Sequence, residues 1–167
     1  MKQRPLLVLL TLFLPGLRLE AQNHREDSVY VFSLIKKADD HFTESNYDSA
    51  FYYCGLAEQY SLEKNYKKGQ AYSLIETADI YIDKDDLVKA AATAEAVQKI
   101  GIQSRDSLVT AIGWLQQAQV YMYSDRFDAA IPLFEKSLHY YLEKHPTRYA
   151  ALAYNDLGYT WGRKGEL

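Results

Sequence analysis

The chain has 167 residues, with 19 Lys+Arg against 22 Asp+Glu, a formal net charge of −3 and 48% apolar residues. This length suits one ordinary domain, and the composition is that of a globular protein rather than a disordered one. The slightly acidic balance argues against nucleic-acid binding, which needs a basic face. The single cysteine, Cys54, excludes an internal disulfide framework and a cysteine-based zinc site.

The N-terminus has the three-part pattern of a secretory signal peptide. A short basic start precedes an apolar run over 6–14, and Pro15-Gly16 is expected to end any helix there. This run is far shorter than the roughly 20 residues that a permanent membrane helix needs. We predict cleavage after Ala21, which separates a signal peptide (1–21) from a short linker (22–27). The product is then exported, periplasmic or secreted; the alternative is a buried N-terminal helix.

The rest of the chain repeats with a period of 40 residues. A small residue is followed three positions later by a ring, then by a polar turn and a second apolar segment that carries an alanine. The small residues are Ala38, Ala78, Ala118 and Gly158, the rings are His41, Tyr81, Tyr121 and Trp161, and the alanines are Ala50, Ala90 and Ala130. Within a segment these residues recur at three- and four-residue spacing, which places them on one face of a helix. The pattern predicts helix–turn–helix hairpins.

Seven helices are expected from this register. They lie near 28–44, 47–63, 69–84, 87–100, 107–124, 127–143 and 148–163. Residues that can accept hydrogen bonds from first-turn amides mark the starts at Asp27-Ser28, Asp106-Ser107 and Thr147. Breaks between repeats are expected at Asn65, Lys67-Lys68-Gly69 and His145-Pro146.

These segments resemble the tetratricopeptide repeat (TPR) family. The resemblance rests on 46–57 and 126–137, which look like second helices, and on Tyr154, Leu157, Gly158 and Trp161 of a first helix. It implies an all-α fold, an α-solenoid of stacked antiparallel helix hairpins with about three and a half repeats. The repeats are placed near 31–66, 67–106, 107–146 and, in part, 147–167. The period is longer than the usual repeat of about 34 residues, which implies longer helices or connectors.

In this family the first helices line a concave face that binds peptides or other proteins. The positions that match it are Ile35, Asp39, Thr43, Ile75, Asp79, Asp83, Leu115, Gln119, Tyr123, Asn155, Tyr159 and Arg163. Three of these residues are aspartates, which favours a basic or extended partner segment. The alternative is that these carboxylates form a solvated helix face.

No motif for catalysis, phosphate binding or metal binding occurs in the sequence. His41 and Cys54 fall in packed columns of the repeat, so both are interpreted as packing residues. We therefore expect a protein that is not an enzyme and that needs no cofactor and no metal.

Two functions from different classes fit the sequence. The first is an exported TPR module whose task is to bind a protein or peptide. The alternative is the extracytoplasmic sensory part of a larger bacterial signalling protein, with a histidine kinase or a DNA-binding domain as its output. The last hairpin has a first helix without a second, so we expect further chain to follow or the C-terminal end to self-associate. No nucleic-acid partner and no membrane span beyond the signal peptide are expected.

Overall fold

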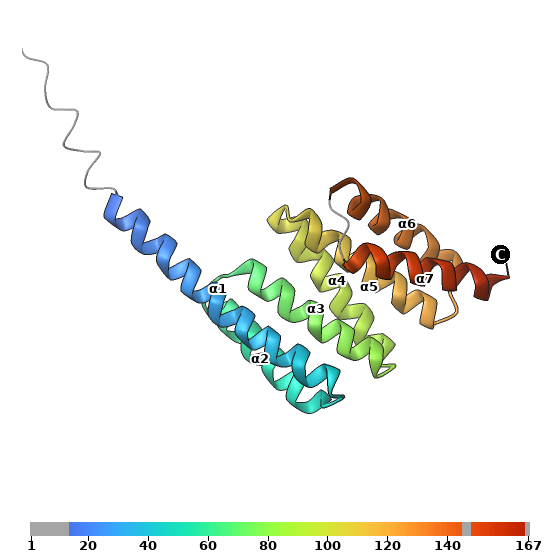
Figure 1. Cartoon of the computed structure of the whole chain (residues 1–167), viewed down its shortest axis with the longest axis horizontal. Coiled ribbons are helices and arrows are strands. Elements are labelled where there is room, and N and C mark those ends of the chain that lie inside the picture. Colours follow the sequence, from blue (N-terminus) through green and yellow to red (C-terminus); the bar gives the residue numbers. More distant parts are fainter. Residues whose placement is uncertain (1–13, 145–147, 166–167) are drawn as a thin grey trace, which may run out of the picture.

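The computed structural model describes residues 14–144 and 148–165, which are almost entirely helical (Figure 1). The helices are α1 (Leu14–Thr43), α2 (Tyr47–Glu63), α3 (Lys67–Asp83), α4 (Leu87–Ser104), α5 (Ser107–Tyr123), α6 (Phe127–Lys144) and α7 (Arg148–Lys164). The described residues contain no strand. The predicted all-α solenoid of helical hairpins is confirmed.

The turns between the helices share one backbone conformation. The middle residue of each described turn has a positive φ, and these residues stand 20 positions apart. They are Ser45, Asn65, Asp85, Arg105 and Asp125, with φ between 50° and 58°. Side chains at three helix starts then accept hydrogen bonds from first-turn amides, at Asn46, Asp86 and Asp106. Because the turn recurs unchanged, helices α2 to α7 have nearly equal lengths of 17 or 18 residues.

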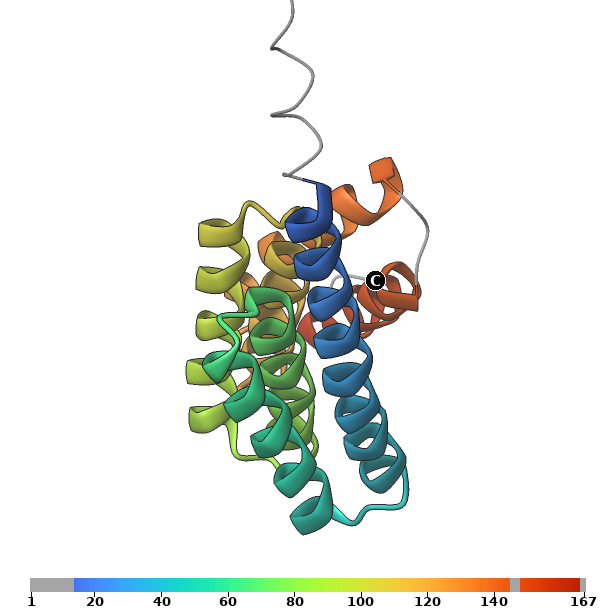
Figure 2. The ribbon, with the colours of Figure 1, turned by 90° about the vertical axis from the view of Figure 1, so that its left-hand side faces the viewer.

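The helices form two layers. Each helix packs against the next one along the chain, and α1, α3, α5 and α7 also contact one another in that order. Between α2, α4 and α6 the described residues make no such contacts. Figures 1 and 2 show the resulting row of hairpins. The odd-numbered helices are therefore the inner layer of the stack, where a concave face would lie.

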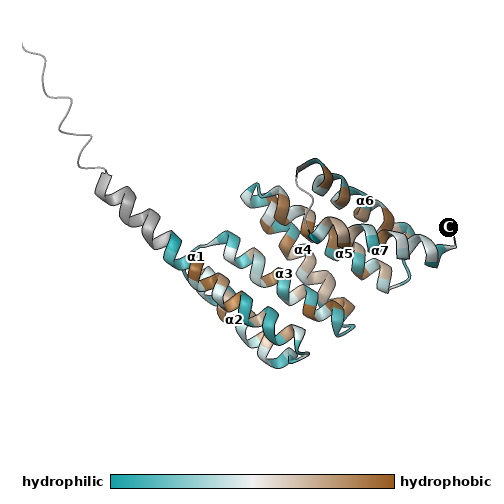
Figure 3. Ribbon diagram, viewed as in Figure 1, coloured by the Kyte–Doolittle hydropathy of each residue, from teal (hydrophilic) through white to brown (hydrophobic). Residues whose placement is uncertain are grey.

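The columns of small residues lie where the two layers touch. The alanines at 38, 78, 118, 50, 90 and 130 are all 0% exposed, as the repeat register predicts. At Gly101 an added Cβ would lie 2.6 Å from the backbone nitrogen of Thr110, so α4 and α5 approach too closely for a side chain. At Gly158 an added Cβ would meet nothing within 4 Å. Figure 3 shows the apolar stripes along the helices and the polar turns.

The start of the first helix was predicted wrongly. Helix α1 begins at Leu14 and continues through the predicted linker (22–27) and the predicted start at Asp27-Ser28. Pro15 and Gly16 lie in its first turn, where a proline is tolerated because first-turn amides have no intrahelical partner. Asp27 does not cap a helix; its carboxylate accepts a hydrogen bond from the Tyr60 hydroxyl at 2.7 Å.

The predicted break at Lys67-Lys68-Gly69 is also wrong, because these residues form the first turn of α3 and the chain reverses at Asn65. Gly69 is buried there, and an added Cβ would meet the Ser61 hydroxyl. The predicted break at His145-Pro146 and the helix start at Thr147 lie outside the described residues. So does most of the predicted signal peptide. Among the described residues, no helix is both long enough and apolar enough to span a membrane.

Candidate functional site

Three of the predicted groove residues belong to the hydrophobic core. Ile35, Ile75 and Leu115 are only 6%, 1% and 1% exposed. Their column packs within the hydrophobic clusters that join the hairpins, so it offers no open surface to a partner. The equivalent residue of α7, Asn155, is exposed.

A second group lies near the C-terminal ends of the odd-numbered helices. Thr43, Asp83, Tyr123, Tyr159 and Arg163 are all exposed. Some of these side chains join one hairpin to the next. The Tyr47 hydroxyl donates to Asp83 at 2.6 Å, and the Arg163 guanidinium donates to Asp125 at 2.8 Å and to the Tyr159 hydroxyl at 2.7 Å. These bonds explain the polar character of this edge without a ligand.

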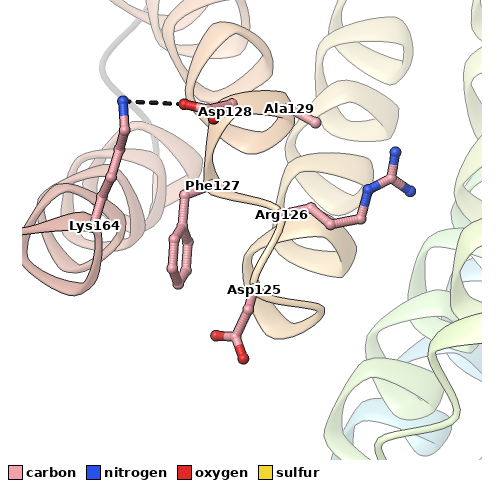
Figure 4. A pocket seen from close by; sticks show the side chains of 6 residues that line it. All are labelled: Asp125, Arg126, Phe127, Asp128, Ala129 and Lys164. Carbon is pink, nitrogen blue, oxygen red and sulfur yellow. Dashed lines mark ion pairs between the residues drawn. The ribbon is translucent and has the colours of Figure 1, made fainter.

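An open recess of about 300 Å³ lies at the same edge (Figure 4). Asp125, Arg126, Phe127, Asp128, Ala129 and Lys164 line it. Its carboxylates and its lysine already have ionic partners, since Lys164 pairs with Asp128 at 3.0 Å and Asp125 pairs with Arg163, and the Arg126 guanidinium lies 4.5 Å from the centre of the Tyr121 ring. The recess therefore presents no unmatched group that would select a ligand.

Of the three remaining predicted residues, Asp79 and Gln119 form hydrogen-bonded pairs between neighbouring odd-numbered helices, whereas Asp39 forms no such bond to another described residue. The Gln116 amide donates to the backbone oxygen of Ile75 at 2.9 Å and to Oδ1 of Asp79 at 2.7 Å. The Gln119 amide donates to Oδ2 of Asp156 at 2.8 Å. The two residues of each side-chain pair stand 37 positions apart, so the same geometry recurs at both junctions.

The junction between α1 and α3 differs because the equivalent positions, also 37 apart, are Asp39 and Glu76. We call Asp39, Glu76 and Asp79 the carboxylate cluster. Glu76 is 8% exposed. Burial, and then the neighbouring charges of Asp79 and Asp39, raise the pKa of Glu76 to about 7. Burial likewise raises the pKa of Asp79 to about 6, although the Gln116 hydrogen bond and Arg148 oppose the shift.

Tyrosines and one arginine lie beside the carboxylate cluster. The positive charge of Arg148 lowers the pKa of Glu76 and Asp79, but its guanidinium donates to the Tyr149 hydroxyl at 3.3 Å and lies 5.0 Å from the centre of that ring. Tyr149 stacks on Tyr141 with 5.9 Å between ring centres. The Tyr141 hydroxyl is buried and has no hydrogen-bond partner among the described residues.

The sequence prediction missed Glu76, Gln116 and Asp156. A signal for them exists, because residues 36, 76, 116 and 156 form a polar column with the 40-residue period. The family pattern indicated a different column, that of Asp39, Asp79 and Gln119. The structure shows that residues of these two columns face each other between neighbouring odd-numbered helices. The role of one column therefore becomes clear only when the other is known.

The two candidate reactive residues lie in packed positions. Cys54 is 2% exposed, and burial raises the pKa of its thiol to about 12, which keeps it protonated near neutral pH. The His41 ring stacks on Tyr53 with 5.4 Å between ring centres and an interplanar angle of 6°. Among the described residues, no group of three or more His, Cys, Asp or Glu is placed to hold a metal ion.

No family model matches the sequence, and no curated protein matches it.

Proposed function

We propose that the protein is an exported TPR module that binds a segment of another protein on the inner face of its odd-numbered helices. The observation that carries this proposal is the carboxylate cluster of Asp39, Glu76 and Asp79 in the inner layer. Burial opposes ionisation of Glu76 and Asp79, and no ion pair with another described residue offsets this cost. A partner segment that binds these carboxylates would account for their presence in the inner layer.

The architecture favours an extended partner segment. Each hairpin of a solenoid contacts only its neighbours, so the inner face is long and runs across successive helices. A segment that crosses this layer meets the carboxylate cluster on α1 and α3. It then passes the polar pairs of α5 and α7 and the exposed Tyr123 and Tyr159.

Site-specific photocrosslinking in the native host tests which face is used. A photoreactive amino acid is placed at Tyr123 or Asn155, which are exposed on odd-numbered helices, or at Val88 or Ile102, which are exposed on α4. We expect the same partner protein to crosslink from the first two positions and not from the second two. Crosslinks from the α4 positions alone would contradict the proposal.

Export is tested separately. When the full chain is expressed in a Gram-negative host, we expect the product outside the cytoplasm, with its N-terminus near Gln22. N-terminal sequencing of the purified product measures this. Recovery of intact Met1 from the cytoplasm would contradict export but not binding at the inner face.

A further inference from the structure

The three junctions between odd-numbered helices have different hydrogen-bonding capacity. At two of them an amide N–H donates to a carboxylate: Gln116 to Asp79 and Gln119 to Asp156. At the α1–α3 junction, Asp39 and Glu76 occupy the equivalent positions. When ionised, both can only accept hydrogen bonds, so neither can satisfy the other.

At this place one carboxylate forms no bond and one buried acceptor lacks a donor. Glu76 is 8% exposed and makes no hydrogen bond or ion pair with another described residue, while its carboxylate oxygens keep some contact with solvent. Oε1 of Gln116 is buried and also has no described partner, although the amide nitrogen of the same side chain is fixed on Asp79. A buried acceptor without a donor is unfavourable, and so are neighbouring carboxylates without a counter-charge. N–H donors that carry a positive charge would relieve both costs.

We propose that the carboxylate cluster, together with Oε1 of Gln116, binds the ammonium or guanidinium group of one lysine or arginine side chain. This inference rests on the proposed function, because the side chain belongs to the partner segment on the inner face. It gives the class of partner: a segment with a basic residue that enters the α1–α3 junction.

The surrounding groups favour an organic cation. An ammonium group carries three N–H donors and a guanidinium group five, which can bond to the Glu76 carboxylate and to the unpaired Oε1 of Gln116. Tyr141 and Tyr149 lie close enough for the Asp79 charge to raise the pKa of both hydroxyls, and tyrosine rings attract cations. The described residues offer no cluster suited to a metal ion, and an anionic ligand would be repelled.

Arg148 does not already fill this site. Its guanidinium is engaged with Tyr149 and forms no ion pair within 4 Å of Asp39, Glu76 or Asp79. One arginine also leaves the three ionised carboxylates with a net negative charge. A second cation therefore improves both the charge balance and the hydrogen bonding.

The test begins with a random peptide library, displayed and selected on the intact purified chain at pH 8, where Glu76 is ionised. Each Lys or Arg of a selected peptide is then replaced by Gln, and affinities are measured by fluorescence anisotropy. The protein variant is Glu76→Gln. Its matched control is Glu95→Gln, which removes the same charge from an exposed position on α4.

We expect one Lys or Arg of each peptide to be required, with a loss of at least about tenfold in affinity on replacement. Glu76→Gln should cause a similar loss for the basic peptide and little for its Gln version, while Glu95→Gln should change neither by more than about twofold. Equal losses in both variants would overturn the inference, since they indicate only a general effect of charge. Binding of Ca²⁺ alone that Glu76→Gln abolishes would overturn it in favour of a metal site.

The two proposals can fail separately. If selected peptides bind without any basic residue and crosslink from Tyr123, the inner face is a binding surface but the cation site is wrong. If no peptide binds and partner crosslinks arise only from α4, both proposals are wrong.

Discussion

Replacing Glu76 with Gln should make the protein more stable at alkaline pH. The carboxyl of Glu76 has its pKa raised from 4.5 to about 7, first by burial and then by Asp79 and Asp39, with Arg148 opposing. The folded chain thus binds this proton more tightly than the unfolded chain does. The stability that follows is fully present below about pH 4.5 and is lost as the pH rises through 7. Asp79, with its pKa raised to about 6, acts in the same direction.

The size of the effect follows from the shift. Each pKa unit corresponds to about 1.4 kcal/mol, so an ionised Glu76 costs about 3 kcal/mol at pH 8. A glutamine keeps the volume and can donate its amide to Asp39 or Asp79, as Gln116 does to Asp79. Since the neutral amide still has a cost of burial, we expect Glu76→Gln to stabilise the chain by about 1–3 kcal/mol at pH 8 and by close to zero at pH 5.

Urea unfolding followed by far-ultraviolet circular dichroism measures this at the two pH values, with Glu95→Gln as the control. The control should change stability by less than about 0.5 kcal/mol at both. The slope of the transition should be compared as well, because repeat proteins can unfold in steps. If Glu76→Gln destabilises the chain at pH 8, or has the same effect at both pH values, the assigned environment of Glu76 is wrong.

Three further predictions concern packing. Gly101→Ala should destabilise the chain by about 1–3 kcal/mol, because the added Cβ would lie 2.6 Å from the Thr110 nitrogen. Gly158→Ala should stabilise it by up to about 1 kcal/mol, since nothing lies within 4 Å of the added Cβ. Urea unfolding that gives changes of the same sign for both variants would contradict this. Ala130→Asp places a charge at a site that is 0% exposed and should cost about 3 kcal/mol or more; an unchanged unfolding midpoint would refute the repeat register. The Cys54 thiol should react with a disulfide reagent only after unfolding, and rapid reaction of the native chain would contradict its burial.

The sequence was sufficient to predict most of the fold. Helix α2 has the predicted bounds, 47–63, and the ends of α3 to α7 differ by four residues at most. This agreement has a physical origin, because the columns of small residues must be buried between helices and the polar turns recur at a fixed spacing. The start of α1 could not be found in this way. Its first part precedes the repeat, and the periodicity that reports burial is absent there.

The candidate site was predictable only in part. Asp39 and Asp79 were found from the family pattern, but Ile35, Ile75 and Leu115 in the same set are buried. Periodicity shows which residues share a helix face. It does not show which of them meet the next hairpin, since this depends on how neighbouring helices cross. The pairing of positions 37 residues apart is a property of the stack, so the partners of the predicted residues became clear only from the structure.

The α1–α3 junction stands out because the rest of the chain is so consistent. Turns, helix lengths and small-residue columns all agree on one stack, and two of its three junctions match a donor with an acceptor. Such agreement across levels is what makes a sequence specify a structure, and local departures from it concentrate at functional sites. Asp39 opposite Glu76 is a departure that a glutamine at either position would remove, as glutamines do at the other two junctions. This departure lowers stability at alkaline pH, and the cation that we propose at the carboxylate cluster would offset that cost.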